Sequence, residues 1–192
     1  GKILILAPGN YPLFLPFASA LHAWAAGNSV WLKSAPGTLA LHQHVRELFL
    51  EIGGLEPWFH LLGEDKSNYQ ASLPEVQKVV LVGSAETGRI VLSQAGEALV
   101  PAVAELSGWD TVLIHPKADM DIAAKAVAFG LSLNMGRTCV APRRILLQGS
   151  VEQFEASFLE AIRGRGHAPL PDQERELVAE MREAGAKALW AA

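Results

Sequence analysis

The chain has 192 residues, half of them hydrophobic, which is enough to bury one large core or one core and part of another. Its 16 basic and 20 acidic residues give a net charge of −4 and are dispersed, which excludes the basic surface that nucleic acid requires. No apolar run reaches the roughly 20 residues of a membrane span, and the single cysteine cannot form an internal disulfide, so we expect a cytoplasmic protein.

Short aliphatic runs alternate with helical stretches in the first half of the chain. The runs suit buried parallel strands and cover residues 2–7, 29–33, 58–62 and 78–82. Residues 13–26 are expected to form a buried helix. Apolar residues that recur on one face predict a second helix, with Thr38 as its N-cap and Gly53 as its C-terminal stop. This alternation predicts a doubly wound α/β sheet over residues 1–104.

The second half of the chain predicts part of another α/β domain, beginning near Glu105 and covering residues 105–192. A strand expected over residues 101–105 leads into it. Its own expected elements are two strands, over residues 111–115 and 143–148, and a helix over residues 119–133. Ser150 and Gln153 have the spacing of a capping box at the start of a further helix. A loop over residues 164–171 should then separate it from a last helix that ends near Gly185.

Residues 134–142 (NMGRTCVAP) suggest a chemical site, because they place Cys139 in a glycine-containing loop between a helix and a strand. The alternative is that Cys139 is a small buried hydrophobic residue, as free cysteines often are. Glu105 stands at the end of an apolar strand, before a turn, and could be either a catalytic carboxylate or a solvated strand end.

Two weaker patterns concern phosphate and metal binding. Gly83 and Gly88 follow a strand and open a helix, where a parallel sheet presents backbone N–H groups to phosphate, although a turn without function fits equally well. His42 and His44 diverge on a predicted helix and have no Cys or carboxylate partners at zinc spacing, so we expect no metal site.

Taken together and in this order, several segments resemble the aldehyde dehydrogenase superfamily. They are residues 7–12 (APGNYP), 25–33 (AAGNSVWLK), 81–88 (LVGSAETG), 105–108 (ELSG), 117–121 (KADMD) and 134–142. The resemblance covers nearly the whole chain and weakens after about Gln148. It implies a Rossmann-like domain that binds NAD or NADP, followed by part of the catalytic domain.

The resemblance also implies roles for individual residues. Cys139 would attack the aldehyde as a thiolate, and the resulting thioester would be hydrolysed to the carboxylic acid. Asn10 and the backbone N–H of Cys139 would hold the oxyanion, and Glu105 would be the general base. The implied cofactor-binding residues, which contact ribose or pyrophosphate or line the site, are Pro8, Lys33, Gly83, Ser84, Gly88 and Leu106.

Some positions depart from the family pattern. Pro36 stands where the family usually has an acidic residue for the ribose hydroxyl groups, so the choice between NAD and NADP stays open. Ser107, Trp109 and Arg137 replace the commoner glycine, lysine and glutamine, and the loop around Gly63 is short.

Family members are much longer than this chain, so we expect it to form homo-oligomers or to associate with missing parts of the same polypeptide. The expected substrate is a small-molecule aldehyde. Two alternatives remain. One is a catalytically silent domain of this fold with a structural or oligomerisation role. The other is thioester reduction, which uses the same thiol chemistry in reverse.

Overall fold

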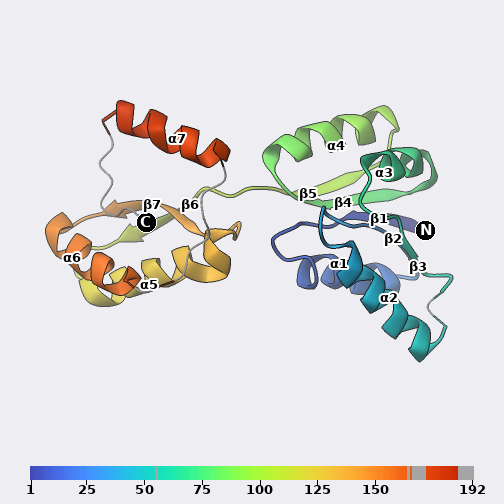
Figure 1. Cartoon of the computed structure of the whole chain (residues 1–192), viewed down its shortest axis with the longest axis horizontal. Helices are drawn as coiled ribbons and strands as arrows, with labels where there is room; N and C mark the ends of the chain where they lie inside the picture. The colour runs from blue at the N-terminus through green and yellow to red at the C-terminus, as the bar shows by residue number, and fades with distance from the viewer. Residues whose placement is uncertain (55, 164, 166–171, 186–192) are drawn as a thin grey trace. The chain divides into compact units, whose positions relative to one another are not determined.

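The computed structural model describes residues 1–54, 56–163, 165 and 172–185, and the chain forms two compact units, Gly1–Ser107 and Gly108–Ala192 (Figure 1). The division lies slightly after the boundary predicted at residue 104. The reason is that Glu105 still pairs with Val82 in the sheet of the first unit. Within the described ranges, no helix is both long and apolar enough to cross a membrane.

The first unit contains a five-stranded parallel sheet with the order β3-β2-β1-β4-β5. Its strands are β1 (Lys2–Leu6), β2 (Ser29–Lys33), β3 (Phe59–Leu61), β4 (Lys78–Val82) and β5 (Ala102–Glu105). In the register, Leu6 at the end of β1 lies opposite Lys33 and Leu81. All five strands therefore end at the same edge of the sheet, which we name the carboxyl edge. This arrangement confirms the predicted doubly wound fold.

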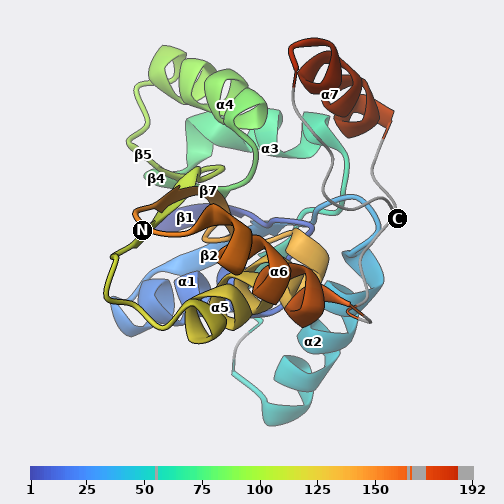
Figure 2. The same cartoon turned by 90° about the vertical axis from the view of Figure 1, so that its left-hand side faces the viewer.

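Helices cover both faces of this sheet (Figures 1 and 2). On one face, α1 (Phe14–Ala25) and α2 (Leu39–Ile52) pack against side chains such as Ile5 and Leu32. On the other face, α3 (Lys66–Ser72), the short 3-10 helix η1 (Leu73–Glu75) and α4 (Ala85–Glu97) pack against Leu4 and Val79. The inner strands β1, β2 and β4 bury side chains such as Leu4, Leu32 and Val79, which explains their continuous aliphatic sequences.

Helix α1 differs from the buried helix predicted over residues 13–26. It buries Ala20 and Ala23 against the sheet, but Phe14 is 72% exposed and Leu21 is 62% exposed. The prediction was therefore wrong for one face of this helix. An apolar sequence cannot by itself reveal which face a partner covers.

The start of α2 also differs in detail from the expectation. Thr38 occupies the N-cap position, but its hydroxyl donates a hydrogen bond to the carbonyl oxygen of Ala35. Glu64 provides the capping acceptor instead, because its Oε1 accepts the N–H of Leu39 at 2.9 Å. Gly53 ends the helix at a positive φ of 81°, as its sequence position predicts.

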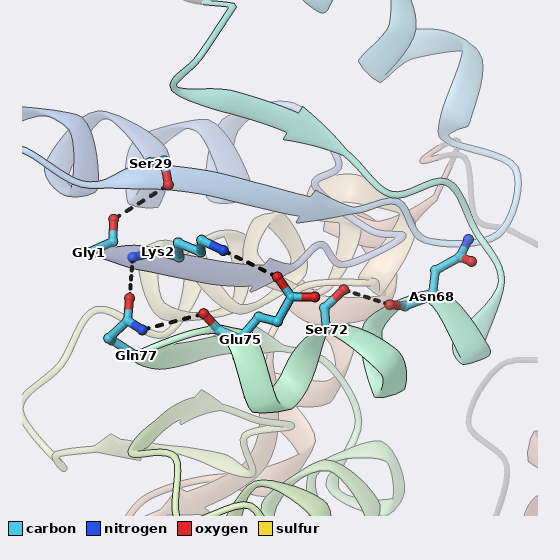
Figure 3. Close-up of polar contacts among 7 residues, drawn as sticks. All are labelled: Gly1, Lys2, Ser29, Asn68, Ser72, Glu75 and Gln77. Carbon is cyan, nitrogen blue, oxygen red and sulfur yellow. Dashed lines mark hydrogen bonds and ion pairs between the residues drawn. The ribbon is translucent and has the colours of Figure 1, made fainter.

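The opposite, amino edge of the sheet is closed by polar contacts around the first residues of β1 (Figure 3). The Lys2 ammonium pairs with Glu75 at 3.2 Å, and the Lys2 backbone N–H donates to the Gln77 side chain at 2.6 Å. The hydroxyl of Ser29 donates to the carbonyl oxygen of Gly1. These contacts tie β1 to its neighbours on both sides.

The second unit contains two parallel strands, β6 (Asp110–Ile114) and β7 (Pro142–Leu147). Helices α5 (Met120–Ser132) and α6 (Val151–Ile162) pack on this sheet through a core that includes Ile114, Ala124 and Phe154. The 3-10 helix η2 (Leu133–Gly136) follows α5, and α7 (Asp172–Glu183) follows α6 in the chain.

The capping box predicted for α6 places its acceptor correctly, because Ser150 Oγ accepts the N–H of Gln153 at 3.2 Å. The predicted last helix corresponds to α7. Apart from Arg165, the loop predicted over residues 164–171 lies outside the described residues.

Candidate active site

Every predicted site residue of the first unit except Gly88 lies at or just beyond the carboxyl edge. Pro8 and Asn10 follow β1, Lys33 ends β2, Gly83 and Ser84 follow β4, Glu105 ends β5 and Leu106 comes next. Backbone hydrogen bonds join neighbouring segments here, from Ala7 to Lys33 at 3.0 Å and from Gly83 to Glu105 at 3.0 Å. The parallel sheet therefore gathers residues that are far apart in the sequence.

The order of the strands marks one place on this edge. The chain runs outward from β1 through β2 to β3, then returns to the other side of β1 for β4 and β5. Ligands of such sheets bind at the carboxyl ends of the strands on either side of this reversal, here β1 and β4. The loops after these strands carry Asn10 and Ser84.

The segment after β4 forms the N-terminus of α4. Ser84 is the N-cap residue, and its hydroxyl accepts the N–H of Thr87 at 3.2 Å. A helix N-terminus at the carboxyl edge of a parallel sheet offers N–H groups to an anion such as pyrophosphate. The position of Gly83 and Ser84 is therefore consistent with the predicted contact to the cofactor.

Gly88 has a local structural role. It is buried one turn into α4, where a Cβ atom would lie only 2.7 Å from both methyl carbons of Leu106. The absence of a side chain thus lets α4 lie directly against Leu106. The structure brings these two predicted residues together through packing.

The loop that carries Asn10 is held in place by a buried histidine. His42 is 0% exposed, and its Nε2 lies 2.7 Å from the carbonyl oxygen of Pro12. Because a carbonyl can only accept, Nε2 carries the hydrogen, and Nδ1 accepts the hydroxyl of Ser34 at 2.7 Å. His42 thereby connects α2 with the loops that follow β1 and β2.

Asn10 itself is partly buried in this loop, and its side-chain oxygen accepts the N–H of Tyr11 at 3.0 Å. This contact fixes the orientation of the amide, in which the oxygen faces the Tyr11 N–H and the nitrogen is on the other side. An apolar hollow of about 460 Å³ adjoins the residue, and its lining includes Tyr11, Phe14 and Phe17.

Lys33 lies at the carboxyl edge with a neighbouring carboxylate. Lys33 is only 9% exposed, and this burial lowers the pKa of its ammonium group. The negative charge of Glu64 raises the same pKa and so offsets part of the decrease. The backbone N–H groups of Leu39 and then Gly37 hold the pKa of Glu64 below its usual value. The side chains of Lys33 and Glu64 therefore influence each other's pKa at this edge of the sheet.

Cys139 lies in a tight turn of the second unit and is exposed. The turn is closed by the N–H of Ala141, which donates to the carbonyl oxygen of Thr138 at 3.2 Å, and Arg143 donates to the same oxygen at 3.3 Å. The alternative that Cys139 is a buried hydrophobic residue is therefore wrong. An exposed thiol in a fixed turn is accessible to an electrophile.

The backbone around this turn is unusual. Asn134, Met135 and Gly136 have consecutive positive φ values of 50°, 55° and 77°. Such values are uncommon for residues with side chains and often occur at functional sites. In addition, Gly108 lies so close to the Cys139 carbonyl that a Cβ atom there would overlap it.

The aldehyde dehydrogenase family model matches residues 1–173, which is most of the chain. The chain belongs to the aldehyde dehydrogenase family. This membership confirms the resemblance expected from the sequence motifs.

Two curated family members illustrate the sequence relationship. A probable coniferyl aldehyde dehydrogenase of Pseudomonas aeruginosa is 33% identical over 165 residues, covering 85% of this chain and 35% of that protein. A succinate semialdehyde dehydrogenase [NAD(P)+] of Escherichia coli is 29% identical over 180 residues, covering 92% of this chain and 39% of that protein. The chain thus spans little more than a third of these relatives.

Solved structures of the family have the same fold. An aldehyde dehydrogenase of Mycobacterium tuberculosis complexed with NAD+ matches with a TM-score of 0.84 and 25% identity, covering 97% of this chain and 42% of that one. An NADP-dependent enzyme of E. coli matches with a TM-score of 0.87 and 25% identity, covering 97% of this chain and 43% of that one.

Two residues near this site were not among the predicted site residues. Glu64 follows β3 after a glycine, a position that the carboxyl-edge rule could have indicated. The sequence suggests for His42 only the metal-ligand role weighed above, and no sequence signal pairs it with Ser34 and the Pro12 carbonyl.

Proposed function

We propose that this chain carries the cofactor-binding core and the nucleophile segment of an enzyme that oxidises an aldehyde to a carboxylic acid with NAD or NADP. The observation that carries the proposal is the exposed Cys139, held in a turn of an aldehyde dehydrogenase family chain. The substrate would be a small-molecule aldehyde. The site would act in the cytoplasm, within a homo-oligomer or together with further parts of the same polypeptide.

The residues of the first unit fit a dinucleotide by their chemistry. Lys33 supplies a cation, and the N-terminus of α4 at Ser84 supplies N–H groups for pyrophosphate. Pro8 and Leu106 lie on segments beside these groups. A bound nicotinamide would accept the hydride that leaves the substrate carbon.

The proposed chemical steps use the protein's own groups. The Cys139 thiolate adds to the aldehyde carbon, while the Asn10 amide and the Cys139 backbone N–H stabilise the negative charge on the oxygen. Loss of hydride converts this adduct to a thioester on Cys139. Glu105 then removes a proton from water, which attacks the thioester, releases the carboxylic acid and regenerates the thiol.

The first experiment measures thermal unfolding with NAD and with NADP, together with the rate of Cys139 alkylation. A nucleotide at about a hundred times its Kd should add about 2.7 kcal/mol to the free energy of unfolding. It should also change the alkylation rate if the thiol and the cofactor site form one active centre. Absence of any stabilisation would contradict the proposal and favour the silent structural domain.

The second experiment assays aldehyde-dependent reduction of the nucleotide in the complete enzyme. Cys139→Ala should abolish turnover while nucleotide binding persists. Undiminished turnover in a folded Cys139→Ala variant would overturn the assigned mechanism. Assays in both directions, with an aldehyde and with a thioester, separate aldehyde oxidation from thioester reduction.

A further inference from the structure

The segment between β2 and α2 lacks a carboxylate at the position where the family resemblance places one for the cofactor ribose. Pro36 occupies that position, and its side chain cannot accept a hydrogen bond. The 2′ and 3′ hydroxyl groups of a ribose are donors that a carboxylate recognises well. The fold brings one to this junction from elsewhere in the chain.

That carboxylate belongs to Glu64, which follows β3. Its Oε1 accepts the N–H of Leu39 in the first turn of α2 at 2.9 Å, across a separation of 25 residues. The backbone N–H of Gly37, next to Pro36, also stabilises the charged form of Glu64. Glu64 is therefore fixed at the start of α2.

The surroundings of Glu64 include the cation expected to contact the ribose. Lys33 and Glu64 interact electrostatically, although no ion pair joins them in the part of the chain that the structure describes. The loops carrying them are also joined, because Ser34 donates its backbone N–H to the Gly63 carbonyl at 2.9 Å. Lys33 and Glu64 thus lie on hydrogen-bonded loops at one corner of the sheet.

The occupied helix terminus has opposite consequences for the two nucleotides. A helix N-terminus ordinarily favours an anion such as phosphate. Here Glu64 already uses the N–H of Leu39 and adds a negative charge. A ribose hydroxyl can donate to that carboxylate, whereas a 2′-phosphate, with about −1.5 to −2 charges near neutral pH, would be repelled.

We propose that Glu64 takes the ribose-recognition role that Pro36 cannot perform, and that its carboxylate makes this site prefer NAD to NADP. This inference rests on the proposed function of the first unit as a dinucleotide site. It assigns cofactor preference to a residue outside the family position for that contact.

The test compares Kd values for NAD and NADP, measured by calorimetry or thermal stabilisation, in the wild type and in Glu64→Gln. The glutamine keeps an acceptor for the Leu39 N–H but removes the charge. We expect the affinity for NADP relative to NAD to rise about tenfold or more. The matched control is Glu51→Gln, the same charge change at an exposed position in the last turn of α2, which should leave the ratio unchanged.

A second variant separates charge from folding. Glu64→Asp keeps the negative charge with a shorter reach, so it should still disfavour NADP while binding NAD more weakly. If nucleotides bind but Glu64→Gln and Glu51→Gln give the same ratio, the role of Glu64 is overturned while the proposed function stands. If the wild type binds neither nucleotide, the proposed function and this inference both fail.

Discussion

The two units position their candidate site residues by different means. In the first unit, the residues follow the ends of regular parallel strands whose register is continuous. In the second unit, Cys139 lies in a turn that follows three consecutive residues with positive φ, and β6 and β7 shift register between Asp110 and Thr111. Side chains of the first unit should therefore be replaceable without moving the backbone, whereas the nucleophile depends on the backbone itself.

In the first unit, the largest expected effect comes from removing the side chain of Asn10. Asn10→Ala should lower kcat/KM about 10² to 10³-fold, because it removes a proposed donor to the oxyanion. The free energy of unfolding should change little, which denaturant unfolding would check. Asn10→Asp has the same size without the donor and should be impaired as well. Full activity in either variant would contradict the assigned role.

The two hydrogen bonds of buried His42 provide a test of the stability of the first unit. His42→Leu fills similar space but leaves the Ser34 hydroxyl and the Pro12 carbonyl without their partner, so we expect a loss of about 2–4 kcal/mol in the free energy of unfolding. The matched control is His44→Leu on the same helix, because His44 is exposed and contacts Glu47. Equal losses in the two variants would show that these hydrogen bonds contribute nothing specific.

The close approach of Gly108 to the Cys139 carbonyl tests the second unit. Gly108→Ala should force the turn to move, which we expect to cost about 1–3 kcal/mol of unfolding free energy and to change the rate of Cys139 alkylation. Because the opposing atom belongs to the backbone, no side-chain rotation can relieve the overlap.

Gly96→Ala is the control for that change in the first unit. Gly96 lies in α4 with no atom within 4 Å of an added Cβ, so alanine should stabilise the protein by up to about 1 kcal/mol. The comparison of the two units would fail if Gly96→Ala and Gly108→Ala changed stability in the same direction.

The smallest expected effect is the pH dependence contributed by Glu64. Backbone N–H groups of Leu39 and Gly37 lower its pKa from the ordinary 4.5, so its ionised form stabilises the folded chain above that value. This contribution should be lost as pH falls through the lowered pKa. The difference in unfolding free energy between wild type and Glu64→Gln should therefore shrink on acidification. A difference that does not vary with pH would contradict this assignment.

Much of the framework was predictable from the sequence. The aliphatic runs located all seven described strands to within one residue at each end, because buried parallel strands leave a continuous apolar signal. The glycine stop at Gly53 and the cap at Ser150 were also predictable, since both are local interactions.

Interactions across the fold were not predictable in the same way. Thr38 was expected to cap α2 with its own side chain, but Glu64, distant in sequence, provides that cap. The exposed face of α1 and the bridge made by His42 likewise depend on tertiary neighbours. The candidate site residues were predicted from motifs, and their individual roles remain predictions.

The central position of β1 has a consequence for folding. Its contact with β2 closes a loop of 28 residues, measured from Gly1 to Ser29, whereas the contact of Lys2 with Gln77 beside β4 spans 75. Closing the longer loop costs roughly 0.9 kcal/mol more in chain entropy. We therefore expect the β1–β2 pair to form before β4 packs against β1. Destabilising substitutions between β1 and β4 should then increase the rate of unfolding and leave the rate of folding nearly unchanged.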